Sequence, residues 1–280
     1  MSKNILLIND MPGYGKVALG AMIPILSAMG HYIHNLPTAL VSNTLNYGKF
    51  EILDTTDYMR NSLKIWGELG FSFDCLCTGF LVSSEQVDMI TEFILNNRKN
   101  NILVISDPIM GDDGKLYNGV SESRIDLMRK LIKNADITIP NVTEAIFLTE
   151  SNYESSGIYE NEINVLIDKV RKLGPKSVVI TSVPVKNTDR HMVCGYNHME
   201  NRYFYLPYEH IPVTFPGTGD IFSAVMTGKL LNGHSLEESV KMAMTAVRFL
   251  IEQNKNNQDK FKGILIERFI TEIENISSVD

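Results

Sequence analysis

Cysteine is scarce in this 280-residue sequence, and it contains no long hydrophobic run. Three cysteines cannot all pair, and Cys75 and Cys77, two residues apart on a predicted strand, do not complete a metal-ligand set. We therefore expect buried thiols rather than a disulfide framework or a cysteine metal site. The apolar run at residues 5–8 is too short for a signal peptide, and no later run approaches a membrane span. A cytosolic protein with no membrane partner is expected.

Basic charge is also in short supply. The 26 Lys and Arg residues are outnumbered by 33 Asp and Glu residues, and they do not gather into a run. A nucleic-acid partner is therefore not expected. The six histidines are scattered without an H-E-x-x-H pattern, so no chemistry is assigned to them. Because 44% of the residues are hydrophobic, the chain can bury a large core, and we expect a single α/β domain over residues 1–280.

Apolar, β-prone segments recur along the chain with helical patterns between them. They cover residues 5–8, 39–42, 74–78, 102–106, 136–139 and 178–181. This alternation is typical of βα units on a mostly parallel sheet. Residues 192–196 and 203–206 alternate around a polar turn, which predicts an antiparallel hairpin that extends the sheet.

Helix signals separate these strands. Residues 17–29 carry an apolar face with Pro24 inside it, which predicts a kinked helix. Capping boxes are predicted at Ser83 with Gln86 and at Ser235 with Glu238. Residues 151–161 and 254–259 are polar and are predicted to be loops.

The segment Gly217-Thr218-Gly219-Asp220 is the most informative in the chain. Two glycines at a predicted helix start can direct several backbone N–H groups at one anion, and the helix dipole adds positive potential. Asp220 would lie beside that anion as a proton acceptor, an arrangement suited to phosphoryl transfer onto a hydroxyl. A glycine turn followed by an acid in the first helical turn has the same sequence, so both interpretations remain open.

Other strand ends are polar as well, and ligands of parallel sheets bind at the carboxyl ends of the strands. Residues 107–114 contain Asp107, Asp112 and Asp113, which could hold Mg²⁺ near phosphates or form an ordinary Asp/Gly turn. Asn141 and Glu144, three residues apart, can face one point, although a helix cap followed by an acid looks the same. Thr181 ends a strand with a hydroxyl suited to phosphate. Taken together, these signals favour a kinase.

The segment after the first strand gives a competing signal. Gly13, Gly15 and Ala18 have the spacing of a permissive dinucleotide fingerprint. The pattern starts several residues after the strand, and no acid ends the second strand, which disfavours a nicotinamide cofactor. The segment also lacks the spacing of a Walker-type loop.

With these residues in view, the chain resembles the pyridoxal kinase branch of the ribokinase-like superfamily, along essentially its whole length and in the same motif order. The matching segments are Gly217 to Ala224, Asp107-Pro108-Ile109-Met110-Gly111-Asp112, Pro140 to Glu144, Val178 to Ser182, and Ser42-Asn43 with Tyr47-Gly48. The resemblance implies a three-layer sandwich with a central, mostly parallel sheet flanked by helices. It also implies a homodimer that uses ATP and Mg²⁺, often with a monovalent cation such as K⁺.

The resemblance also implies roles for individual residues. Asp220 would be the general base for the 5′-hydroxymethyl group of a B6 vitamer, and Gly217, Thr218 and Gly219 would supply the backbone anion hole. The vitamer would contact Asp10, Thr44, Asn46, Tyr47 and Asp220. ATP would contact Asp112, Asn141, Thr181, Thr218 and Gly219, and Mg²⁺ would be held or organised by Asp107, Asn141 and Glu144.

Two positions depart from the family pattern, which has a serine at Asp10 and a threonine at Leu45 in many members. A carboxylate prefers a protonated ring or a nearby amine to a neutral ring nitrogen. We therefore expect Asp10 to shift the preference toward pyridoxamine. The rival functions are a hydroxymethylpyrimidine kinase of thiamine synthesis and a non-catalytic protein that binds B6 vitamers or nucleotide.

Overall fold

The computed structural model describes residues 1–152 and 157–277. The described chain groups into two compact units, one formed by Met1–Gln86 with Ile211–Asp280 and the other by Val87–His210. We call them the terminal unit and the central unit. The single domain expected for residues 1–280 stays a prediction, and each unit is described in turn.

The terminal unit is built on four strands in the order β4-β1-β2-β3. β1 is parallel to both β4 and β2, and the short β3 is antiparallel to β2. The strands are β1 (Asn4–Pro12), β2 (Tyr32–Val41), β3 (Ile52–Asp54) and β4 (Cys75–Thr78). Residues 5–8 of β1 and all of β4 are buried, which explains the apolar sequences of these two segments.

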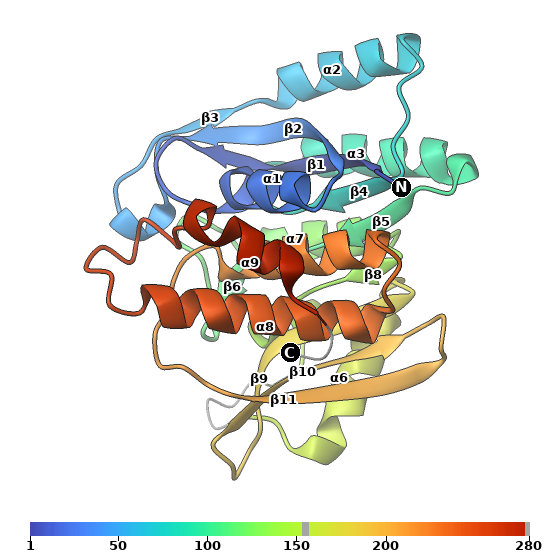
Figure 1. Cartoon of the computed structure of the whole chain (residues 1–280). Helices are drawn as coiled ribbons and strands as arrows, with labels where there is room; N and C mark the ends of the chain where they lie inside the picture. Colours follow the sequence, from blue (N-terminus) through green and yellow to red (C-terminus); the bar gives the residue numbers. More distant parts are fainter. Residues whose placement is uncertain (153–156, 278–280) are drawn as a thin grey trace. The chain divides into compact units, whose positions relative to one another are not determined.

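Helices cover the strands of this unit. They are α1 (Ala18–Ala28), α2 (Thr56–Glu68), α7 (Thr218–Leu231), α8 (Leu236–Asn254) and α9 (Ile270–Asn275), with 3₁₀ turns η1 (Leu45–Tyr47) and η3 (Glu267–Phe269). In Figure 1, α1 lies along β1 and β2, and α7 packs against both α1 and α8. The first turn of α7 thereby precedes a buried stretch of the same helix, from Ile221 to Lys229.

The central unit has five strands in the order β5-β8-β9-β10-β11. β5, β8 and β9 are parallel, and β9, β10 and β11 are antiparallel neighbours. The strands are β5 (Leu103–Ser106), β8 (Ile137–Thr138), β9 (Ser177–Pro184), β10 (Arg190–Asn197) and β11 (Arg202–Glu209). β10 and β11 form the hairpin that the sequence predicts, with Tyr196 opposite Tyr203.

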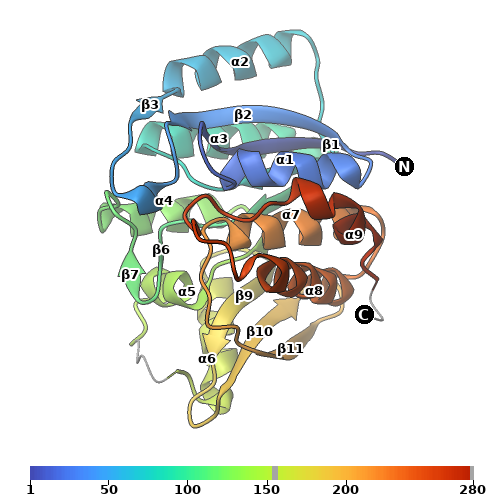
Figure 2. The same cartoon turned by 60° about the vertical axis from the view of Figure 1, so that its left-hand side comes forward.

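The helices of the central unit follow its parallel strands. They are α4 (Ser123–Ile132), α5 (Val142–Thr149) and α6 (Glu160–Arg171), with the turn η2 (Arg98–Asn100) and the small hairpin of β6 (Gly111–Asp112) and β7 (Lys115–Leu116). Helix α3 (Ser84–Asn97) begins in the terminal unit and ends in the central one. Figure 2 shows α6 beside β9 and β10, which it contacts.

Several local expectations are confirmed and others are corrected. Ser235 and Glu238 form the predicted capping box. The box at Ser83 is one-sided, because the Gln86 side chain accepts from Val82 N instead of Ser83 N. The polar segment 151–161 was predicted to be a loop, but α6 already begins at Glu160; residues 153–156 lie outside the described residues.

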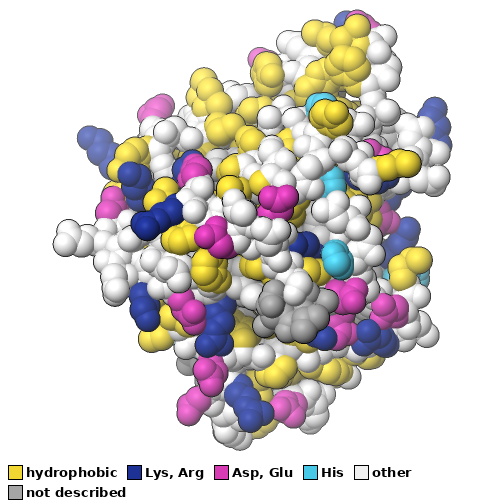
Figure 3. All heavy atoms as spheres, in the orientation of Figure 1, with side chains coloured by type: hydrophobic (Ala, Val, Ile, Leu, Met, Phe, Trp, Pro, Cys, Tyr) yellow, Lys and Arg dark blue, Asp and Glu magenta, His cyan; other side chains and the backbone are white. Residues whose placement is uncertain are grey.

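The surface carries mixed charge. On the face shown in Figure 3, Lys and Arg side chains are interspersed with Asp and Glu side chains. Among the described residues, no helix combines the length and apolar character that crossing a membrane requires.

Candidate active site

The carboxyl end of β1 carries Asn9 and Asp10. The sequence predicts that this strand ends at Ile8, but it runs on to Pro12 with a shift in its register to β2 between Asn9 and Met11. Bulges of this kind change the direction of side chains next to functional sites. Here the extra residue lies on β2, opposite Asp10, and both Asn9 and Asp10 lie near Asp220.

Asp220 lies in the first turn of α7 and accepts hydrogen bonds from two other elements. The side-chain amide of Asn9 donates to its Oδ1 at 3.3 Å, and the backbone N–H of Ala18 also donates to it. Ala18 is the first residue of α1 and adopts a φ of 47°. That conformation costs an alanine about 1 kcal/mol or more, and such strain concentrates at functional sites.

Burial controls the ionisation of Asp220 and its neighbour. Burial raises the pKa of Asp220 to about 6, against the opposing effects of the Ala18 and Asn9 donors. The pKa of Asp10 rises further, to about 7, because of its burial and the nearby charge of Asp220. A carboxylate with a pKa of about 6 is mostly ionised at neutral pH and can still accept a proton, which is the property that a general base needs.

The two glycines that precede Asp220 differ in whether the fold requires a glycine at their position. Gly217 caps α7 with a φ of 86°, and a Cβ there would meet the carbonyl oxygen of Lys16 at 2.3 Å. Gly219 has an ordinary φ, and a Cβ there would meet nothing within 4 Å. Packing therefore requires Gly217 alone, whereas the space above Gly219 is open. Thr218 donates its hydroxyl to the Phe215 carbonyl at 3.3 Å.

The loop predicted to bind a vitamer is held by the C-terminal segment of the terminal unit. Thr44 is buried, and its hydroxyl donates to the Phe261 carbonyl at 2.7 Å. The Tyr47 hydroxyl donates to Asp259 at 2.6 Å, while Asn46 is exposed. Sequence reasoning treated residues 254–259 as a solvated loop and missed this support, because nothing local in the sequence marks it.

The glycine segment 13–15 packs against the same loop. Gly13 N donates to the Val41 carbonyl at 2.6 Å. A Cβ on Gly15 would meet the Thr44 methyl group at 2.3 Å, and its φ is 115°. The glycine spacing that resembles a dinucleotide fingerprint therefore has a packing explanation.

In the central unit, Asn141 and Glu144 form a reciprocal capping box at the start of α5. Asn141 Oδ1 accepts from Glu144 N, and Glu144 Oε2 accepts from Asn141 N, each at 2.9 Å. Glu144 Oε1 also accepts from Met110 N at 3.0 Å and Gly111 N at 3.5 Å. The pair is thus a helix cap, the structural alternative left open by the sequence, and it fixes the segment after β5.

Burial raises the pKa of Glu144 well above its ordinary value, and the charges of Asp107 and Asp112 add to this effect. Asp107 follows β5, and Asp112 lies exposed in the β6–β7 hairpin, where Asp113 and Gly114 both have positive φ. Such a pair is typical of a tight hairpin turn. In the described part of the chain, no three His, Cys, Asp or Glu side chains cluster closely enough to hold a metal by themselves.

Thr181 lies next to this helix cap. It forms a parallel bridge with Asn141, and its backbone N–H donates to the Pro140 carbonyl at 3.0 Å. Ser182 follows with a φ of 58° and bonds to the Tyr208 hydroxyl. The structure therefore brings Asn141 and Thr181, two residues predicted to contact ATP, next to each other.

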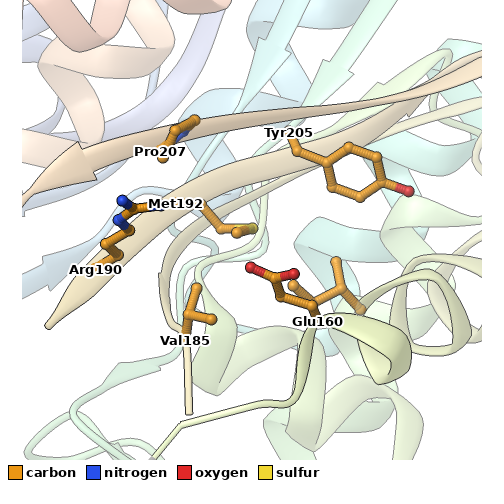
Figure 4. A pocket seen from close by; sticks show the side chains of 7 residues that line it. Glu160, Val185, Arg190, Met192, Tyr205 and Pro207 are labelled. Atoms are coloured by element: carbon orange, nitrogen blue, oxygen red, sulfur yellow. The ribbon is translucent and has the colours of Figure 1, made fainter. Parts of the chain in front are cut away.

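A separate hollow lies in the central unit, where α6 faces the β10–β11 hairpin (Figure 4). Its lining residues are Glu160, Ile163, Val185, Arg190, Met192, Tyr205 and Pro207. None of the site residues predicted from the sequence lines it. It therefore does not contribute to the candidate site.

Comparison with known proteins identifies a matching protein family. The sequence model of the family described as phosphomethylpyrimidine kinase matches residues 21–264. Among curated proteins, the pyridoxine/pyridoxal/pyridoxamine kinase of Bordetella avium is 28% identical over 89% of this chain and 83% of its own length. These matches confirm the resemblance drawn from the motifs.

Solved structures agree. A candidate phosphomethylpyrimidine kinase of Bacteroides thetaiotaomicron, in an orthorhombic crystal form with pyridoxal, is 34% identical with a TM-score of 0.92. The match covers 98% of this chain and 96% of that one. The pyridoxal kinase of Lactobacillus plantarum is 25% identical with a TM-score of 0.85, over 97% and 96% of the two chains. The expected fold class, an α/β fold with a mostly parallel sheet flanked by helices, is confirmed.

Proposed function

Because the chain belongs to the phosphomethylpyrimidine kinase family, and is thus a phosphotransferase, we propose that it transfers the γ-phosphoryl group of ATP to the hydroxymethyl group of a B6 vitamer. The Bordetella avium relative is named for all three vitamers, and the Bacteroides thetaiotaomicron neighbour has a crystal form with pyridoxal. The observation that carries the proposal is the half-buried Asp220 carboxylate, held by two donors at the start of α7.

In this mechanism Asp220 accepts the proton of the attacking hydroxymethyl group. Its pKa of about 6 leaves it ionised at neutral pH, and the bond from Asn9 fixes one of its oxygens. The backbone N–H groups of Gly217, Thr218 and Gly219 at the start of α7 stabilise the charge on the transferred phosphoryl group. The open space above Gly219 fits this role, because an anion must approach the backbone closely there.

Residues of the central unit would hold Mg²⁺ and contact the nucleotide. Burial raises the pKa of Glu144, and the charges of Asp107 and Asp112 add to this effect, so a cation would relieve an existing repulsion. Asp107 and Asp112 would hold the ion, with Asn141 and Glu144 organising the segment between them. The bound ion would neutralise phosphate charge, and Thr181 would contact the phosphates. A monovalent cation such as K⁺ remains part of the proposal.

Asp10 would set the preference among the vitamers. Asp10 is half-buried and its pKa is raised to about 7, so a cationic partner would stabilise its ionised form. A protonated pyridine ring or the amine of pyridoxamine would supply that charge. Thr44, Asn46 and Tyr47 would complete the vitamer contacts. When Asp10 is replaced by serine, kcat/KM for pyridoxamine should therefore fall more than kcat/KM for pyridoxal, each measured relative to kcat/KM for pyridoxine.

The description of the matching family favours one second candidate, phosphorylation of a hydroxymethylpyrimidine. The test is an ATP-dependent phosphorylation assay with pyridoxal, pyridoxamine, pyridoxine and hydroxymethylpyrimidine, on wild type and Asp10→Ser. We expect the highest kcat/KM for a B6 vitamer, with pyridoxamine the most affected by the substitution. A higher kcat/KM for the pyrimidine would replace the proposed substrate class. Binding without turnover of any substrate would indicate the non-catalytic binding protein.

A further inference from the structure

Asn9 is a buried side-chain amide at the end of β1, and no role was assigned to it from the sequence. Its side chain is 2% exposed, yet all of its hydrogen-bonding groups have neighbours. Oδ1 accepts from the backbone N–H of Asp10 at 3.0 Å and from that of Phe80 at 2.8 Å. Nδ2 faces Asp220 Oδ1 at 3.3 Å and the Met22 sulfur at 3.8 Å.

These contacts determine which way the amide faces. An amide oxygen only accepts and an amide nitrogen only donates, so the two ends of Asn9 are not interchangeable. A flipped amide would set its NH₂ group against two backbone N–H donors. It would also set its oxygen against the Asp220 carboxylate. Two main-chain donors therefore oblige Asn9 to present an N–H to Asp220.

Gly79 closes the pocket around this amide. It follows β4, and its backbone N–H donates to the Ile8 carbonyl at 2.9 Å. A Cβ on Gly79 would lie 2.5 Å from the amide carbon and nitrogen of Asn9. Since backbone groups fix the Asn9 side chain, it could make room for a Cβ on residue 79 only by moving away from Asp220. The glycine thus preserves the space that the orientation of Asn9 requires.

We propose that Asn9 is a positioning residue for the reaction: its amide, locked by the N–H groups of Asp10 and Phe80, orients the Asp220 carboxylate and keeps it ionised near neutral pH. The inference rests on the proposed role of Asp220 as the base. The titratable group that faces Asp220 is Asp10 on β1, and the backbone of Ala18 supplies the second donor. Asp10 opposes the effect of Asn9, because a like charge disfavours ionisation.

Asn9→Asp and Gly79→Ala test this in complementary ways. Asn9→Asp has the same shape and still accepts from both backbone N–H groups, but it loses the donor. Gly79→Ala displaces the amide without adding charge. The control is Gly67→Ala in α2, where a Cβ would meet nothing within 4 Å. A hydrogen bond to a carboxylate is worth enough to move its pKa by about one unit or more.

The readouts are the pH profile of kcat and the titration of the Asp220 carboxyl by ¹³C NMR, assigned with Asp220→Asn. In wild type, activity should fall as the pH drops through about 6, because the base becomes protonated. Both variants should move this limb and the NMR titration upward by about one pH unit or more, and Gly67→Ala should not. A limb that stays in place, or that moves only in Asn9→Asp, where charge is added, would overturn the inference.

The NMR titration separates this inference from the proposed function. If no substrate is phosphorylated, the function fails, but the carboxyl titration still reports whether Asn9 controls Asp220. If turnover is found and the titrations of wild type and Gly79→Ala coincide, the function stands and the role of Asn9 fails.

Discussion

Asp220 and Glu144 occupy the same position on two different helices. Each is the third residue after the N-cap, of α7 in the terminal unit and of α5 in the central unit, and burial raises the pKa of both. Glu144 reaches back to its own N-cap, Asn141, whose side chain reciprocates. Asp220 has a glycine as N-cap, so its donors come from β1 and α1 instead.

This difference separates a structural acid from a candidate base. At least three backbone N–H groups surround the Glu144 oxygens, and its side chain holds the segment after β5 in place. Asp220 is held by the side-chain amide of Asn9 and by the backbone N–H of Ala18, a residue with a strained backbone. The space above Gly219 in the same helical turn is open. An acid in the first turn of a helix is therefore judged by its N-cap residue and by which elements supply its donors.

The largest expected effect is on turnover and concerns Asp220. Asp220→Asn keeps the shape and removes the base, so kcat should fall by about 100-fold or more while the affinity for ATP changes little. Steady-state kinetics on the best vitamer and nucleotide-binding calorimetry measure the two quantities. Thermal unfolding serves as the control, because the neutral amide removes a buried charge and should not destabilise the fold. Retained turnover would show that Asp220 is not the base and would erase the contrast with Glu144.

Much of this contrast could be predicted from the sequence, because helix starts and strand ends have local signatures. The Gly217–Asp220 turn and the Asn141–Glu144 pair were both located, each with its structural alternative. What could not be predicted was which groups each acid contacts, since these partners lie far away in the sequence. Asn9 lies 211 residues from Asp220, and Thr44 lies 217 residues from Phe261. The irregular register between β1 and β2, where Thr38 and Ala39 stand opposite Asp10, has no local sequence signature either.

A smaller effect, on stability, is expected at Glu144. Glu144→Ala leaves the buried N–H groups of Met110 and Asn141 without an acceptor, which should lower the free energy of unfolding by about 1–3 kcal/mol. Glu144→Gln can still form the capping box and should lose less. Chemical denaturation of both variants measures the difference. A Glu144→Gln protein of wild-type stability but with kcat reduced as far as in Asp220→Asn would place Glu144 in the chemistry and break the comparison.

The smallest expected effect concerns Asp10, whose burial beside Asp220 raises its pKa to about 7 from an ordinary value of 3.8. Between these values the folded protein binds a proton that the unfolded chain has released, so this group favours folding at low pH. Its contribution is lost as the pH rises through 7. Asp10→Asn cannot ionise, so its stability relative to wild type should grow from pH 4 to pH 8 and reach about 1 kcal/mol or more.

Thermal unfolding across that pH range checks the expectation, with Asp57→Asn as the control because the Asp57 side chain is 92% exposed. A pH-independent difference in Asp10→Asn would mean that Asp10 is not electrostatically strained in the free protein. Asp10 and Asp220 would then not repel each other before a ligand binds. A difference that grows with pH and disappears when a cationic vitamer binds would instead show that the strain at Asp10 is relieved by the ligand. That result would sharpen the contrast, because the capping box of Glu144 is already satisfied within the chain.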